Sequence, residues 1–138
     1  MERVLGRYSS YIYAILRIVV GFTFMLHGTQ KLFGWPPSAQ PGGGGPAEGL
    51  MLVAGIIELV CGALVMVGFF TSFAAFVASG MMAVAYFMAH QPNGALPASN
   101  GGDAAVLYCF IFLYLAARGS GIWSVDSIAR GTGTVSNS

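Results

Sequence analysis

Four long apolar segments constrain this chain more than any other feature of its sequence. They cover residues 11–33, 50–69, 71–89 and 103–118, and they contain very few charged side chains. A helix that crosses a bilayer needs about 20 predominantly apolar residues. In lipid, the backbone of such a segment is satisfied only in a helix or a closed barrel, and these segments are too long and too uniformly apolar for barrel strands. The sequence therefore predicts an all-α bundle of four transmembrane helices.

The composition supports a polytopic membrane protein. Charged residues make up 8% of the 138 residues and hydrophobic residues 56%, whereas a soluble domain carries about 25% charged residues. The net charge is +1 and no basic cluster is present, so we expect no nucleic acid among the partners. We expect a single membrane domain over residues 1–128, with the lipid bilayer as its main partner, and a disordered tail over residues 129–138.

Basic residues near the ends of the segments predict the orientation of the bundle. Four arginines lie on the two terminal sides of the chain, whereas Lys31 is the one basic residue that borders the two longer loops. Both termini are therefore predicted to be cytoplasmic, with both loops rich in glycine and proline on the other side. The first loop contains the glycine run at residues 42–45, which is typical of a linker.

Two charged residues lie at membrane depth, Arg17 in the first segment and Glu58 in the second. A charge there costs a few kcal/mol or more, so it persists where it is paired, buried in a bundle or used. Arg17 shares a helical face with Gly21 and Gly28, and Glu58 also lies on a face with two glycines. Small residues let transmembrane helices approach closely. We therefore expect Arg17 and Glu58 to face the bundle and to interact, directly or through water. Two interpretations remain: an ion pair that fixes helix register, or the floor of a polar cavity.

A second polar group gathers at the predicted outer side. His27 and Lys31 lie one turn apart near the end of the first segment, His90 follows the third, and Asp103 begins the fourth. Each has a plain structural explanation, because a lysine can reach the interface and an aspartate can cap a helix. Their common side nevertheless indicates a site. The candidate catalytic residues are Arg17, Glu58 and His27, and the candidate ligand-binding residues are Lys31, His90 and Asp103.

Several cofactor classes are not expected in the chain itself. The histidines lack the spacing of a metal site, so no metal is predicted. Cys61 and Cys109 lie in separate segments without a C-x-x-C pair, which argues against dithiol chemistry by the chain's own thiols. No glycine motif for nucleotides follows a predicted strand. Electrons for any redox reaction would therefore come from a partner protein.

Four ordered motifs resemble those of the DoxX family. The segment from Arg17 to Gly34, R-x3-G-F-x-F-M-L-H-G-x2-K-L-F-G, resembles the family's first helix, and Gly55 to Thr71 resembles its E-L-x-x-G-x-x-L-x-x-G-x-x-T motif. N-G-G-D at 100–103 resembles the family's N-G-x-E, with Asp103 in place of the more usual glutamate. G-x-G-x-W-S-V-D at 119–126 resembles its closing motif.

The resemblance implies a four-helix protein of the inner (plasma) membrane, and it suggests a chemistry. Some members of the family are linked to quinone-dependent oxidoreductases, and others are associated with oxidative-stress complexes. The first hypothesis is thus an integral membrane subunit of a quinone-linked oxidoreductase system, with a polar intramembrane cavity for quinone and a membrane or peripheral partner. The alternative is a non-enzymatic scaffold or a carrier of a small molecule or lipid. Whether the chain is itself an enzyme stays open, and the glycine faces are compatible with a homo-oligomer.

Overall fold

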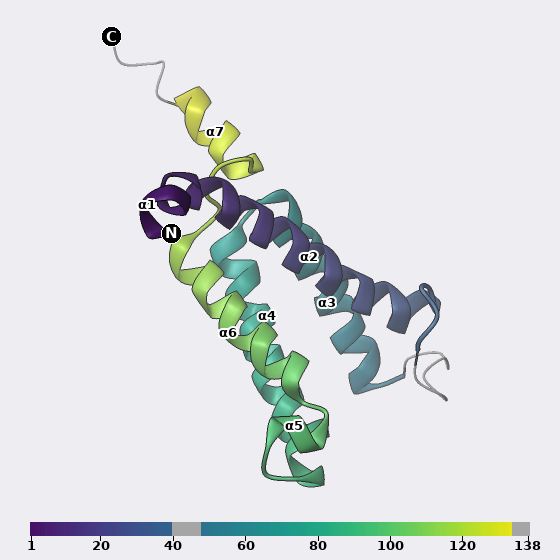
Figure 1. Ribbon diagram of the computed structural model, residues 1–138. Coiled ribbons are helices and arrows are strands. Elements are labelled where there is room, and N and C mark those ends of the chain that lie inside the picture. Colours follow the sequence, from purple (N-terminus) through teal and green to yellow (C-terminus); the bar gives the residue numbers. More distant parts are fainter. Residues whose placement is uncertain (40–47, 134–138) are drawn as a thin grey trace.

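The computed structural model describes residues 1–39 and 48–133 (Figure 1). Within these two ranges every regular element is a helix, and none is a strand. This confirms the all-α prediction. The glycine run at 42–45, predicted to be a linker, lies outside the described residues.

The helices follow the predicted segments closely. They are α1 (Glu2–Leu5), α2 (Ser9–Phe33), α3 (Leu50–Val67), α4 (Thr71–Ala85), α5 (Pro97–Asn100), α6 (Asp103–Arg118) and α7 (Val125–Gly133). A 3-10 turn at Gly6–Tyr8 joins α1 to α2, and a π-helical turn at Tyr86–His90 followed by a 3-10 turn at Gln91–Asn93 prolongs α4.

The tail predicted over residues 129–138 begins within α7, which includes residues 129–133, and residues 134–138 lie outside the described residues. A local cap begins this helix: the Ser124 hydroxyl oxygen accepts a hydrogen bond from the backbone N–H of Ser127 at 3.1 Å. Such a cap satisfies a donor that would otherwise be free at the start of a helix.

Within residues 1–39 and 48–133, three helices are long and apolar enough to cross a membrane, by length and composition. They are the helical stretches Glu2–Phe33, Leu50–Val67 and Thr71–Asn93. The remaining long helix, α6, has 16 residues, which is shorter than the usual length of a span. The structure therefore supports a membrane protein and three of the four predicted spans.

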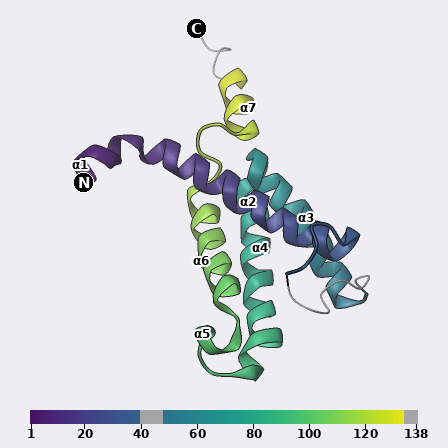
Figure 2. The same ribbon diagram turned by 45° about the vertical axis from the view of Figure 1, so that its right-hand side comes forward.

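The long helices form two pairs, α2 with α3 and α4 with α6 (Figure 1). The short turn between Val67 and Thr71 joins the pairs, which diverge with distance from it, as a second view also shows (Figure 2). Both α1 and α7 lie at the end that contains this turn. Where the pairs meet, the rings of Phe24 and Phe112 contact each other with centroids 4.7 Å apart, and both side chains are buried.

Glycines set the close approach of α2 and α3. A Cβ atom on Gly21 would lie 2.5 Å from the backbone nitrogen of Met66, and one on Gly28 would lie 2.5 Å from that of Leu59. Real side chains do not tolerate such distances, so the two backbones touch only because the glycines are there. The predicted glycine faces are confirmed, and they fix a register in which Gly28 of α2 lies against Gly55 and Leu59 of α3, so Glu58 is level with about Gly28.

Candidate ligand-binding pocket

Arg17 is fully buried, and its partners are backbone carbonyls of the segment that follows α6. Its Nη1 donates to the carbonyl oxygens of Ser120 and, at 3.0 Å, of Ile122, and its Nη2 donates to that of Trp123 at 2.6 Å. A planar guanidinium with several fixed donors suits such a group of acceptors. Arg17 therefore ties the chain after α6 to the end of the bundle that contains the α3–α4 turn.

Further contacts complete this attachment, which we call the C-terminal anchor (Tyr13, Arg17, Thr71, Ser120 and Asp126). The Tyr13 hydroxyl donates to the carbonyl of Gly119 at 2.6 Å. The Ser120 hydroxyl lies 2.9 Å from Thr71 Oγ1 and 2.5 Å from Asp126 Oδ2. The hydrogen bond from Ser120, helped by backbone N–H groups at the start of α4, holds the pKa of Asp126 below its ordinary value.

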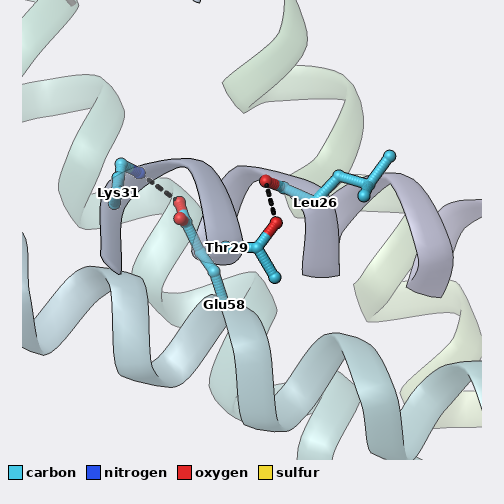
Figure 3. Close-up of polar contacts among 4 residues, drawn as sticks. All are labelled: Leu26, Thr29, Lys31 and Glu58. Carbon is cyan, nitrogen blue, oxygen red and sulfur yellow. Dashed lines mark hydrogen bonds and ion pairs between the residues drawn. The ribbon is translucent and has the colours of Figure 1, made fainter. Parts of the chain in front are cut away.

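Glu58 pairs with Lys31. The Lys31 Nζ lies 2.5 Å from Glu58 Oε1, and Figure 3 shows the Glu58 side chain extending from α3 to the ammonium group on α2. Thr29, drawn in the same view, instead donates back to the carbonyl of Leu26 at 2.9 Å. The Glu58 side chain is 3% exposed and that of Lys31 27%. Among the described residues, the second carboxylate oxygen, Oε2, has no hydrogen-bond partner.

The expected interaction between Arg17 and Glu58 is therefore wrong, and side-chain direction explains why. Helical side chains lean toward the N-terminus of their own helix. On α2, Arg17 lies about three turns, roughly 16 Å, from the level of Glu58 and leans further away. Lys31 lies on the other side of that level and leans back toward it. Glu58 on α3 leans toward the Lys31 end, so these two side chains converge.

A pocket of about 360 Å³ lies at the Lys31–Glu58 end, between α2, α3, α4 with its π-helical turn, and α6. The polar and ionisable residues that line it are His27, Lys31, Glu58, His90 and Tyr108. Four of the six predicted site residues are thus brought together in one place. Arg17 belongs to the C-terminal anchor instead. Asp103 is exposed at the first position of α6 and is not among the lining residues.

The walls of the pocket are apolar and rich in methionine. Four methionines contribute to them, namely Met51, Met81, Met82 and Met88. Methionine has three rotatable bonds and a polarizable sulfur, so it adapts to different shapes. The sequence analysis missed these residues because methionine at helical spacing looks the same in a packed core and in a pocket wall.

Tyr108 of α6 supplies an ordered aromatic wall that the sequence analysis also missed. Its hydroxyl donates to Thr23 Oγ1 at 2.9 Å. Its ring lies 5.4 Å from that of Phe24 and 6.1 Å from that of His27, centroid to centroid. These contacts fix the ring between α2 and α6. Only the fold could identify it, because Tyr108 comes from a helix far along the chain.

His90 reaches the pocket rim through the π-helical turn at Tyr86–His90. Its Nδ1 lies 3.3 Å from the carbonyl oxygen of Asn100. The buried Asn100 side chain donates to the Gly94 carbonyl at 3.0 Å and accepts from the Gly102 N–H at 2.8 Å. This network orders the loop before α6. Turns of the π type often occur at functional sites.

The described residues contain no group of three or more histidine, cysteine, aspartate or glutamate side chains that could hold a metal ion. The pocket offers other chemistry: ammonium donors from Lys31, a carboxylate from Glu58 and two imidazoles, all at the edge of an apolar slot. Such groups can hold the polar head of an otherwise apolar molecule and exchange protons with it.

Fold and pocket together define a small helical membrane protein with a ligand-sized pocket between its helices. The chain belongs to the DoxX family, whose model matches residues 12–91, as the sequence motifs indicated. It is 43% identical over 126 residues to an uncharacterized protein of Haemophilus influenzae, covering 89% of this chain and 94% of that protein. It is 32% identical over 128 residues to an uncharacterized membrane protein of Mycobacterium tuberculosis, covering 80% of this chain and 77% of that protein. No solved structure matches the chain significantly.

Proposed function

We propose that this protein is the quinone-binding membrane subunit of an oxidoreductase system, with the ring headgroup in the pocket beside Lys31 and Glu58. The observation that carries the proposal is an ion pair between the buried Glu58 and the partly exposed Lys31, both of which line an apolar pocket. Its volume of about 360 Å³ falls within the usual range for small-molecule sites, about 300–1,000 Å³.

The lining residues fit a quinone. A bound quinone supplies a two-electron, two-proton redox couple, whose ring needs apolar walls and whose oxygens need polar partners. Lys31 has three N–H donors, of which Glu58 Oε1 takes one, so others can bind a ring oxygen. The side chains of Tyr108 and Phe24 form walls beside the quinone ring, and His27 can carry protons. In this proposal a partner protein supplies or receives the electrons.

The rim of the pocket supports entry from the lipid phase. Leu50 and Val53 of α3 lie on one side, and Val84 of α4 and Met88 of the π-helical turn lie on the other. These four apolar side chains are 50–64% exposed. In a bilayer such a surface faces acyl chains rather than water. A ligand with an apolar tail suits this opening.

The proposal includes a topology in which α6 is the fourth span and both termini are cytoplasmic in the inner membrane. In support, α6 exposes large apolar side chains along its length, among them Leu107 and Phe110. Asp103 and Arg118 mark its two ends, where charged groups can reach the interfaces. Flanking turns can extend a helix of 16 residues across the apolar layer.

Copurification of quinone tests the proposal. The full chain is extracted in polymer-bounded native lipid discs, and quinone per protein is measured by mass spectrometry against discs that lack the protein. We expect enrichment for the wild type and a return to background for Glu58→Gln. Glu2→Gln is the matched control, because Glu2 is exposed in α1, and it should retain the enrichment. A wild type at background level would contradict quinone binding and favour the scaffold or carrier alternative.

A further inference from the structure

The unpartnered oxygen of Glu58 carries information about what the pocket binds. The side chain is 3% exposed, and Oε2 lies out of contact with solvent without a hydrogen-bond partner among the described residues. Leaving a buried acceptor unsatisfied costs free energy, more so when the group is charged. Buried polar groups in folded proteins are nearly always paired, so each exception needs an explanation.

The existing contacts determine which kind of partner is missing. The Lys31 ammonium already bonds Oε1, and within this ion pair Glu58 is a carboxylate, whose oxygens only accept hydrogen bonds. The neighbouring ring hydroxyl of Tyr108 is directed to Thr23 Oγ1. The group that completes Oε2 is therefore an O–H or N–H donor.

We infer that the pocket selects a ligand whose ring bears a hydroxyl group, so that Glu58 Oε2, which turns toward the pocket when the ligand enters, accepts a hydrogen bond from a phenol or a quinol. This inference rests on the proposed function and names the form of the ligand that the site prefers. The ring of an oxidised quinone offers only carbonyl oxygens. These are acceptors, so they form no hydrogen bond with a carboxylate oxygen, which is also an acceptor. Lys31 can serve either form, because an ammonium donates to a carbonyl and to a hydroxyl oxygen alike. Discrimination between the hydroxyl-bearing ring and the oxidised quinone thus comes from Glu58.

A matched pair of probes tests the inference without any enzymatic activity. 4-Octylphenol and its methyl ether, 4-octylanisole, share the ring and the tail and differ in the hydroxyl proton. The full chain in lipid nanodiscs is labelled with 13C at the methionine methyl groups, and each probe is titrated as a mole fraction of lipid. Met51, Met81, Met82 and Met88 line the pocket. Met1, Met25 and Met66 are not among the lining residues, so their signals report the general effect of probe in the bilayer.

For the wild type we expect the phenol to saturate the shifts of the pocket methionines at a mole fraction at least about tenfold lower than the ether, as for a hydrogen bond to a charged group. In Glu58→Leu the ratio should fall to about one. The double variant Lys31→Met with Glu58→Leu should behave in the same way, and it leaves no unpaired lysine that could disturb folding.

Each outcome discriminates. Equal binding of the two probes by the wild type, or a preference that persists in both variants, would overturn the role of Glu58 while leaving quinone binding in place. If neither probe shifts the pocket methionines, and no quinone copurifies with the wild type, both the inference and the proposed function fail.

Discussion

The two ends of the bundle treat a buried charge in opposite ways. At the end with the α3–α4 turn, Arg17 donates from its two terminal nitrogens to three backbone carbonyls, although its Nε finds no acceptor among the described residues. At the other end, Glu58 has Lys31 as its one partner within the described residues, and its second oxygen has none there, in a side chain that lines a pocket. The first charged group is hydrogen-bonded by the chain's own backbone, whereas the second is left with an acceptor for a further donor.

This difference separates two uses of an intramembrane charge that the sequence alone presents as equivalent. Burying either group costs several kcal/mol unless it is paired and hydrogen-bonded. Arg17 offsets that cost by attaching the segment after α6, so its role is architectural. Glu58 offsets it only in part, which suits a group that meets a ligand. If the comparison is right, removing the two groups should affect different properties of the protein.

The largest effect on stability is expected for Arg17→Met. Three carbonyls in the segment after α6 would lose their donor at once, and each buried acceptor left unsatisfied costs about 1–3 kcal/mol, so we expect a loss of roughly 3–5 kcal/mol in the free energy of unfolding. Arg17→Lys should recover only part of it, because an ammonium cannot match the planar fork. The measurement is unfolding of the purified full chain in detergent.

Arg7→Met is the control for this experiment. Arg7 is exposed and lies over the ring of Tyr8, so its loss should change the free energy of unfolding by about 0.5 kcal/mol or less. If Arg17→Met were as stable as Arg7→Met, the architectural role of Arg17 would be refuted.

The opposite result is expected for the double variant Lys31→Met with Glu58→Leu. Replacing both members of a buried ion pair with apolar groups is often neutral for stability, so the free energy of unfolding should change by about 1 kcal/mol or less. Copurified quinone should nevertheless fall to background, because the polar partners of its ring are gone. Unfolding in detergent and mass spectrometry of the same preparation measure the two properties together.

A large loss of stability in this double variant would contradict the proposed difference between the two buried charges. It would mean that the Lys31–Glu58 pair is as architectural as Arg17. Retention of quinone by a stable double variant would instead show that the pocket does not use the pair.

Periodicity and glycine placement made most of the fold predictable. The spacing of Gly21 and Gly28 on one helix, and of Gly55 and Gly62 on the next, anticipated the close contact of α2 and α3. The helix bounds also follow the apolar segments, because lipid leaves little choice of secondary structure. The same argument placed Arg17 and Glu58 inside the bundle, where both are buried.

The partners of those charges were not predicted, although part of the signal was available. Side-chain lean along a helix favours Lys31 over Arg17 as the partner of Glu58, but the sequence analysis considered only membrane depth and helical faces. The acceptors of Arg17 are backbone carbonyls at 120–123, and no side-chain pattern marks them. Tyr108 enters the pocket only because α6 packs on α4, and this is a property of the whole bundle.

The smallest expected effect concerns Asp126 and tests how far the C-terminal anchor depends on charge. Hydrogen bonds from Ser120 and from the start of α4 lower the pKa of Asp126 in the folded protein, against about 3.9 in an unfolded chain. A lowered folded-state pKa means that the carboxylate stabilises the fold above pH 3.9, and that this contribution is lost as the pH falls through the folded-state pKa. Asp126→Asn should therefore be less stable than the wild type at pH 7, by about 0.5–1.5 kcal/mol for the hydrogen bonds that it weakens, and the difference should shrink toward pH 3.

Thermal unfolding of both proteins in detergent between pH 3 and pH 7 measures this difference in stability. Subtracting one stability curve from the other cancels the contribution of the carboxylates that the two proteins share. A difference that stays constant over this range would show that the anchor holds Asp126 through the geometry of its hydrogen bonds and not through its charge, which would leave Arg17 as the group whose charge the anchor needs.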